Sequence, residues 1–211
     1  MTEIKKDLWN TVVAGRWNPA ILTPKGISKL LFKKQDDSPF EVMVPLDAMG
    51  PPKVRIDGLL VAANFDRLVI DCVKSDWDSF ESSRSYCQKA ICELPKTPLS
   101  ATGYNIRYEI KEPPLGFLDL LNLPLDTSIS DQRLDIKKKE TRRSIAWKDG
   151  FINLHIVKID SETYSILLNF DRKSDDTENL LQWLGIPIDE IKHITKTIMC
   201  SVLKACNESE V

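Results

Sequence analysis

A strict two-residue alternation in the middle of the chain most constrains the fold. Three polar residues, Asn105, Arg107 and Glu109, alternate with four apolar ones: Tyr104, Ile106, Tyr108 and Ile110. Because successive side chains of a β-strand point to opposite faces, this pattern predicts a strand with one face in a core and the other toward water. A strand that is buried on one face only is typical of an antiparallel sheet.

Two further regions are predicted to form antiparallel hairpins. Residues 53–74 hold apolar runs on both sides of a turn sequence at 64–67. Residues 151–170 repeat this arrangement around a turn at 160–162, and Asp149–Gly150 in front of them is a tight-turn signal. Shorter strands are expected within 11–22 and 40–46. The strand residues are too continuous for repeated βαβ units.

Amphipathic helices are expected after each hairpin. Apolar residues recur at spacings of three and four from Trp77 to Leu94, with Arg84 as the one charged interruption, and Ser75 is the expected N-cap. A second such helix is expected to begin at Pro187 and run to Ala205. Thr23 followed by Pro24 predicts a short helix start. The sequence FLDLLNL at 117–123 suggests a small fourth helix.

These elements predict an α+β protein. Its antiparallel sheet or sheets would be built from hairpins, with three to four amphipathic helices packed on one face. Hairpin and helix recur in the order seen at 54–94 and 151–206, which raises the hypothesis of two similar halves. The sequence KEPPLG at 111–116 is the candidate boundary between an N-terminal α+β half (1–110) and a C-terminal half of β-meander plus helix (111–211). The two halves are also compatible with one compact domain.

Charge, apolar runs and cysteines limit the compartment and the partners. The chain has 211 residues and a formal net charge of −2, so bulk charge does not favour nucleic acid or an anionic membrane. Its apolar runs are too short to span a bilayer, so no membrane partner is expected. An odd number of cysteines, five, without a secretion signal predicts free thiols and a cytoplasmic location.

Motifs for metal, cofactor and covalent chemistry are missing from the sequence. There is no C-x-x-C, no H-x-x-x-H and no glycine-rich phosphate loop, so no metal centre and no cofactor are expected. The two histidines, His155 and His193, are interpreted as structural. Carboxylates gather near two helix starts, where the helix dipole already favours them. An enzyme that uses dispersed carboxylates, with no catalytic residue assigned, therefore stays the second alternative.

The basic run KKKETRR at 137–143 is the most conspicuous charged feature. It holds five basic residues and one acidic residue, and both faces of a strand placed here would be polar. The run is therefore expected to be a loop, a projecting ribbon or an edge strand. Three hypotheses stay open: a solvated edge, a contact with protein or with a second copy, and nucleic-acid binding. The rest of the C-terminal half is acidic, which favours the first two.

The function predicted from sequence is non-enzymatic. We expect a soluble binding or assembly protein, as a homo-oligomer or as a subunit of a larger complex, and nucleic-acid binding through the basic run is the first alternative. Residues 94–108, in which two prolines frame a threonine, could present a recognition loop. The candidate partner-binding residues are Asn105, Arg107, Lys137, Lys138, Lys139, Arg142 and Arg143.

Overall fold

A computed structural model describes residues 2–35, 38–45 and 50–204. Its centre is a nine-stranded sheet in the order β2-β3-β4-β5-β1-β6-β9-β8-β7, and all neighbouring strands are antiparallel. The strands are β1 (Glu3–Gly15), β2 (Glu41–Met43), β3 (Lys53–Ile56), β4 (Leu59–Ala63), β5 (Arg67–Cys72), β6 (Leu99–Lys111), β7 (Glu140–Trp147), β8 (Gly150–Lys158) and β9 (Thr163–Lys173).

Five α-helices and one 3-10 helix occur among the described residues. They are α1 (Pro24–Leu30), α2 (Trp77–Glu93), η1 (Leu118–Leu120), α3 (Pro124–Asp131), α4 (Thr177–Leu184) and α5 (Ile188–Leu203). The predicted α+β class is therefore confirmed, with one or two more helices than expected. None of these helices is long and apolar enough to cross a membrane.

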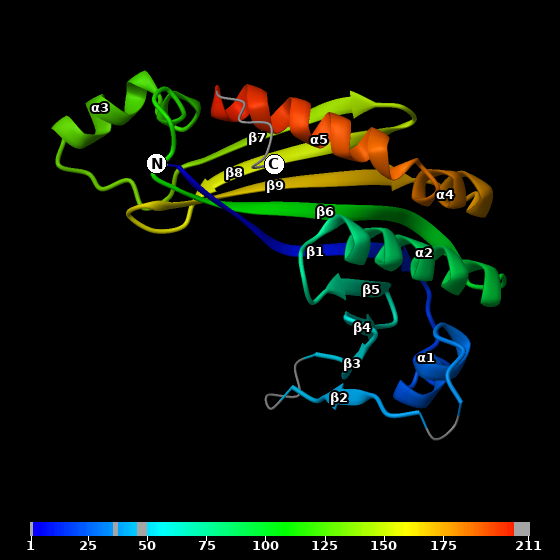
Figure 1. Cartoon of the computed structure of the whole chain (residues 1–211). Helices are drawn as coiled ribbons and strands as arrows, with labels where there is room; N and C mark the ends of the chain where they lie inside the picture. Colours follow the sequence, from blue (N-terminus) through cyan, green and yellow to red (C-terminus); the bar gives the residue numbers. More distant parts are fainter. Residues whose placement is uncertain (1, 36–37, 46–49, 205–211) are drawn as a thin grey trace.

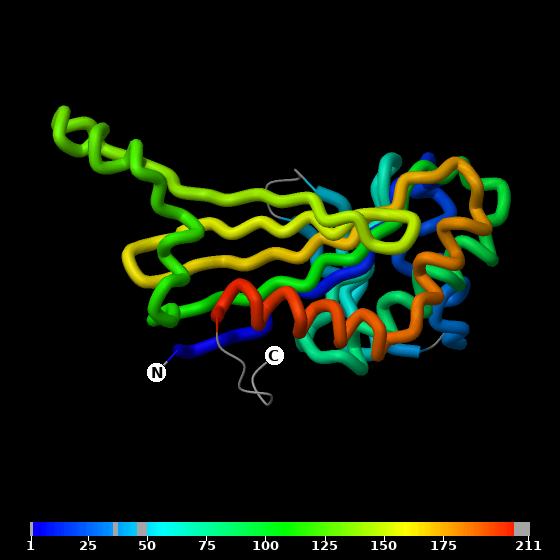
Figure 2. The backbone as a smooth tube through the Cα atoms, turned by 90° about the horizontal axis from the view of Figure 1, so that it is seen from above, coloured from blue at the N-terminus to red at the C-terminus, as the bar shows by residue number. Residues whose placement is uncertain are grey.

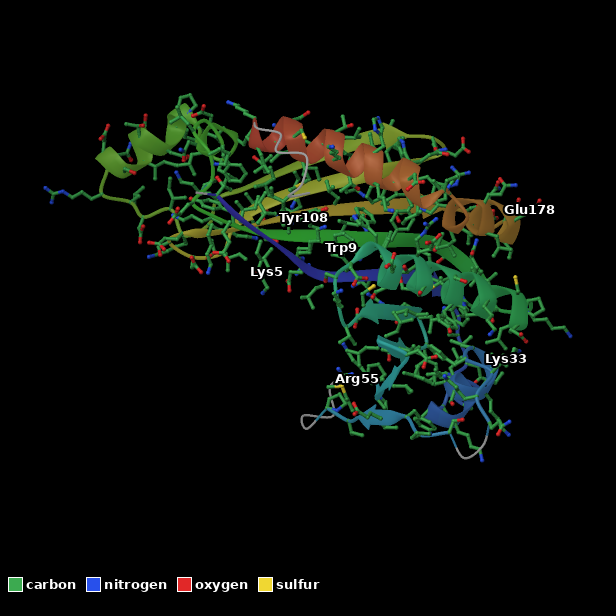
Figure 3. The ribbon with its side chains drawn as sticks, in the orientation of Figure 1. Lys5, Trp9, Lys33, Arg55, Tyr108 and Glu178 are labelled. Atoms are coloured by element: carbon green, nitrogen blue, oxygen red, sulfur yellow. The ribbon has the colours of Figure 1, made fainter. Side chains whose placement is uncertain are left out.

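The helices that pack on the sheet share one face of it (Figure 1). The apolar half of the alternation in β6 lies on this face, where Tyr104 and Tyr108 are fully buried. Phe80 of α2 contacts Tyr104 edge to face, and Trp183 of α4 stacks on the same ring. We call this side of the sheet the helix face and the opposite side the open face. Figure 3 shows Trp9 and Tyr108 near the helices and Lys5 on the other side of β1.

Arg84 explains the charged interruption in the apolar stripe of α2. Its side chain is 4% exposed, and one guanidinium nitrogen donates to the backbone carbonyls of Leu184 and Ile186. The guanidinium also lies over the rings of Phe80 and Tyr104. Burial lowers the pKa of Arg84. The residue thus joins α2 to the connection between α4 and α5.

Two expectations for the first hairpin and its helix are corrected. Residues 53–74 form three strands, because Asp57 and Gly58 both have positive φ and make a second tight turn between β3 and β4. The N-cap of α2 is Asp76, whose carboxylate accepts from the backbone N–H of Ser79 at 2.8 Å, rather than Ser75. The helix start at Thr23–Pro24 is confirmed.

Other element boundaries also differ from the sequence prediction. The first strand begins at Glu3 rather than near residue 11, because Leu8 forms a bulge that hides the alternation before it. The predicted helix at 117–123 is only a 3-10 turn, and α3 and α4 were not predicted. Helix α5 is confirmed from Ile188 to Leu203, and its predicted end at Ala205 lies outside the described residues.

The elements from β1 to α2 and those from β6 to α5 follow a similar order. Each set has a long strand, a connection with helical turns and a three-stranded meander, which gives neighbouring strands in the order β3-β4-β5-β1 and β7-β8-β9-β6. The first set ends in the single helix α2 and has the additional strand β2, whereas the second ends in α4 and α5. The antiparallel pair of β1 and β6 joins the two halves into one sheet. The division into residues 1–110 and 111–211 stays a prediction, because hydrogen-bonded strands cross it.

The expectation of free thiols is correct for three cysteines and wrong for one. Cys72, Cys87 and Cys92 are free, and burial raises the pKa of Cys72 to about 12. Cys200 is disulfide-bonded. Helix α5 ends at Leu203, and Lys204 has a positive φ. Cys206 lies outside the described residues.

Candidate protein-binding surface

The open face carries a continuous row of hydrogen-bonded polar side chains. Asn10, Asn105, Asn169 and Asn153 stand opposite one another in the registers of β1, β6, β9 and β8. Their amides donate in turn, Asn153 to Asn169 at 3.0 Å, Asn169 to Asn105 at 2.9 Å and Asn105 to Asn10 at 2.7 Å. We call this row, with its extensions described next, the polar ladder.

Both ends of the polar ladder continue onto further strands. On one side Asn10 donates to Asp71 of β5 at 3.1 Å, and Lys53 of β3 reaches the same carboxylate at 3.0 Å. On the other side Ser144 of β7 lies 2.7 Å from the amide oxygen of Asn153. Each asparagine amide has two N–H donors and two acceptor lone pairs, so the row retains hydrogen-bonding capacity for a partner.

Most charged side chains of the open face are paired with each other. Salt bridges join Lys5 to Glu109 at 3.5 Å, Arg55 to Glu41 at 3.5 Å and Arg142 to Glu140 at 3.3 Å. Four charged residues of the open face have no salt bridge or side-chain hydrogen bond to any residue in the described part of the chain: Asp7, Arg107, Asp171 and Lys173. The Nε atom of Arg107 is buried and has no hydrogen-bond partner.

A shallow hollow lies beside the polar ladder. It has a volume of about 240 Å³ and is lined by Val12, Gly103, Asn105, Asn169 and Asp171, among others. Gly103 stands directly opposite Asp171 in the register of β6 and β9. A Cβ atom at Gly103 would lie 2.2 Å from the backbone oxygen of Phe170, so glycine at this position allows β6 and β9 to approach closely.

The structure places Asn105 and Arg107 on strand β6 rather than in a recognition loop. Only residues 94–98 connect α2 to β6, and the strand begins at Leu99, earlier than the alternation indicated. Both side chains project from the open face because they occupy the polar positions of the alternation. Asn105 is central in the polar ladder, and Arg107 lies one position farther along the same side of the strand.

The basic run spans the approach to β7 and the first half of that strand. β7 is one edge of the sheet, which is one of the three placements expected from the polarity of both faces. Figure 2 shows the chain reaching β7 from α3, which stands away from the sheet. The run is solvent-exposed except for Lys139 and Thr141, which are partly buried.

Four of the five basic residues of the run form salt bridges with nearby acidic residues. Lys137 pairs with Asp135, Lys138 with Glu140 at 2.7 Å and Lys139 with Asp126 at 2.7 Å. Arg142 pairs with Glu140, whereas Arg143 donates to the backbone carbonyl of Arg142. Of the five predicted cations, only Arg142 shares the open face with Asn105 and Arg107. Arg142 stands opposite His155 on β8, and the same cross-strand row continues through β9 to Arg107 on β6.

The two histidines have different surroundings. His155 lies on the open face, 3.1 Å from a carboxylate oxygen of Glu140. Hydrogen bonds from Lys138 and His155 lower the pKa of Glu140 to about 2. His193 is exposed on α5. The two residues lie on different elements, and neither forms a side-chain hydrogen bond with a cysteine or serine of the described residues.

The candidate carboxylates for an enzyme do not converge. Asp57 pairs with Lys34, Asp66 with Arg67, Asp76 caps α2 and Asp71 belongs to the polar ladder. Among the described residues no group of three or more histidine, cysteine or acidic side chains could hold a metal ion. Acidic residues at 175–178 stand at the start of α4, where Asp176 caps the helix.

Sequence reasoning missed most of the polar ladder. Asn10, Asn153 and Asn169 each occupy a polar position in an alternating strand, but nothing in a linear sequence shows that these positions share one register. Lone asparagines within apolar strands were the available signal. Comparison with known proteins finds no matching family model, no similar curated protein and no similar solved structure.

Proposed function

We propose that this chain is a non-enzymatic assembly protein that binds a protein partner through the open face of its sheet. The partner is a second copy of the chain or another subunit of a complex. The observation that carries the proposal is the polar ladder on a sheet face without helices. A row of half-buried amides with spare donors and acceptors suits a protein surface, where hydrogen bonds accompany close packing.

The size of the open face supports this role. The nine strands hold 72 residues, and at a rise of about 3.3 Å per residue and a strand spacing of about 4.8 Å they cover about 1,100 Å² of sheet. A specific interface needs about 800 Å² from each partner. The open face is therefore large enough for a stable complex without help from the edges.

The charge balance of the open face favours protein over nucleic acid. Basic and acidic side chains are interleaved and largely paired, whereas a phosphate-binding surface concentrates basic residues. The aromatic rings that could stack on bases lie mainly on the helix face, where Trp9 and Tyr104 are fully buried. The basic run remains the place to test for nucleic acid, and its salt bridges argue against that alternative.

The cytoplasmic location expected from the sequence stays a proposal. The three free cysteines support it, and the disulfide at Cys200 argues against it.

Substitution at the centre of the polar ladder tests the proposed function. We expect the wild-type chain to associate in a concentration-dependent way in size-exclusion chromatography with light scattering. Asn105→Arg should abolish this association, because it places a long unpaired cation in the middle of the interface. Phe151→Asp, at an open-face residue that is 53% exposed, should weaken association and leaves the core intact. Circular dichroism verifies folding of both variants.

The control is Lys96→Asp, in the connection between α2 and β6, which should associate like wild type. If the wild-type chain is monomeric, a partner purified from the native host must bind wild type and fail to bind Asn105→Arg. A monomer without such a partner, or association that survives both open-face substitutions, would show the proposal to be wrong. Binding of RNA or DNA that is lost on replacing the five basic residues at 137–143 by alanine would assign function to the basic run instead.

A further inference from the structure

Two features of the open face, the unpaired cation Arg107 and the hollow at Gly103, lie at similar distances from the polar ladder. Arg107 lies two residues from Asn105 along β6, and Gly103 lies two residues from it in the other direction. Asp171 stands opposite Gly103, at the edge of the hollow. Two residues of a strand span about 7 Å, so the unpaired cation and the unpaired anion lie on either side of the ladder at similar distances.

A twofold axis that runs along the polar ladder would superpose these two features. Rotation by 180° about a line in the plane of the interface turns one open face onto another and exchanges the two sides of that line. Arg107 of one copy then lies above Gly103 of the other, next to Asp171. Because the contact is isologous, Asp171 of the first copy receives Arg107 of the second.

From this arrangement we infer that the partner of the open face is a second copy of this chain, packed face to face about a twofold axis along the polar ladder, with Arg107 inserted into the hollow at Gly103 beside Asp171. This inference rests on the proposed function, because it names the partner of the same surface. Two sheets that pack face to face normally align within about 30°, which this axis allows.

Two further features of the central strands agree with this arrangement. Lys173 is exposed and unpaired. The rotation places Lys173 of one copy against the cross-strand row that contains Glu109 of the other copy. The asparagines of the two ladders lie along the axis and face each other, so their spare donors and acceptors meet. Arg107 and Asp171 would each gain a partner that no described residue of their own copy supplies.

Charge reversal at these two positions tests the inference with the full-length chain. Arg107→Asp alone and Asp171→Arg alone each place like charges together in the dimer, and each should raise the dimer dissociation constant at least about tenfold in sedimentation equilibrium. The double variant Arg107→Asp/Asp171→Arg restores opposite charges and should return the dissociation constant to within about threefold of wild type. A merely structural role of either residue predicts no such recovery.

A matched pair away from the open face controls for net charge. Lys96→Asp and Asp175→Arg, both at exposed residues, should leave the dissociation constant unchanged. A monomeric wild type, single reversals that dimerise normally, or a double variant that stays dissociated would each overturn the inference. Loss of association in Asn105→Arg together with failure of the double variant would retain the proposed function and reject only this geometry.

Discussion

Single polar residues of this protein have roles that depend on which face of an element they occupy. Arg84 and Arg107 are both arginines within apolar patterns. Arg84 lies on the helix face, where it donates to two backbone carbonyls and is almost fully buried. Arg107 lies on the open face and has no partner in the described part of its own chain. The first therefore stabilises the fold, and the second is available to a partner.

Asp76 should stabilise the protein in a pH-dependent way. A hydrogen bond from Lys74, with help from the backbone N–H of Ser79, lowers the pKa of Asp76 to about 2. The unfolded value is about 3.9, so the stabilisation is complete above that pH and is lost as the pH falls toward 2. We expect Asp76→Ala to lower the free energy of unfolding by about 1 kcal/mol at pH 7, and by much less near pH 2, in urea titrations.

Asp76→Asn is the matched control, because asparagine caps a helix but has no ionisable carboxyl. It should be closer to wild type than Asp76→Ala at pH 7. Equal effects of Asp76→Ala at both pH values would contradict the role of the ionised carboxylate.

Whole elements were predicted well where side-chain periodicity is long and regular. Strand β6, the second hairpin and helices α2 and α5 all follow from periods of two or 3.6 residues. Helix α4 has only eight residues, too few for a clear period. The short strands β3 and β4 were merged because their apolar residues continue across the turn at Asp57 and Gly58. The positive φ angles of Asp57 and Gly58 set the boundary between β3 and β4, and side-chain periodicity does not indicate it.

Gly58 should be required for the turn between β3 and β4 because of its backbone angle. Its φ is +77°, and a Cβ atom built there meets no atom within 4 Å. Gly58→Ala should therefore cost about 1 kcal/mol of unfolding free energy through backbone conformation alone, measured by urea denaturation. Gly58→Asn should cost less, because asparagine tolerates the left-handed region. Unchanged stability of the alanine variant would mean that the turn takes another conformation in solution.

At the scale of the whole molecule, one sheet unites the two halves of the chain. The central strands β6 and β9 have neighbours on both sides over most of their length, and β1 has them from Asn10 to Ala14, whereas β2 and β7 are edges. Helices cover one face of the central strands, whereas the outer backbone N–H and C=O groups of the edge strands have no partner strand. Its stability should accordingly fall from the centre toward the edges.

Native-state hydrogen exchange should reveal this gradient. Backbone amides of β6 and β9 should exchange slowest, because their opening approaches global unfolding. Amides of the three-residue strand β2 should exchange fastest among the strands, since β2 has one neighbour and no buried residue. Mass spectrometry of proteolytic fragments gives the required resolution. Equal protection of β2 and β6 would contradict a single sheet with this strand order.

The candidate surface could be predicted only in part. Asn105 and Arg107 were identified from the sequence as partner-binding residues, and the structure places both on the open face. The other partner residues proposed from charge, at 137–143, lie at the β7 edge and are engaged mainly with their own neighbours. Charge density along a sequence cannot reveal such pairing, because Asp126 and Lys139 meet only after the chain has turned at α3.

The sequence by itself determined the α+β class and the face toward which each residue of β6 from Tyr104 to Ile110 points. These follow from local geometry, since a strand alternates its side chains whatever its neighbours are. Only the tertiary structure decided that Asn10, Asn105, Asn153 and Asn169 form one hydrogen-bonded row. The strand order and register set that row, and they arise from pairing between residues as far as 95 positions apart, which no local pattern encodes.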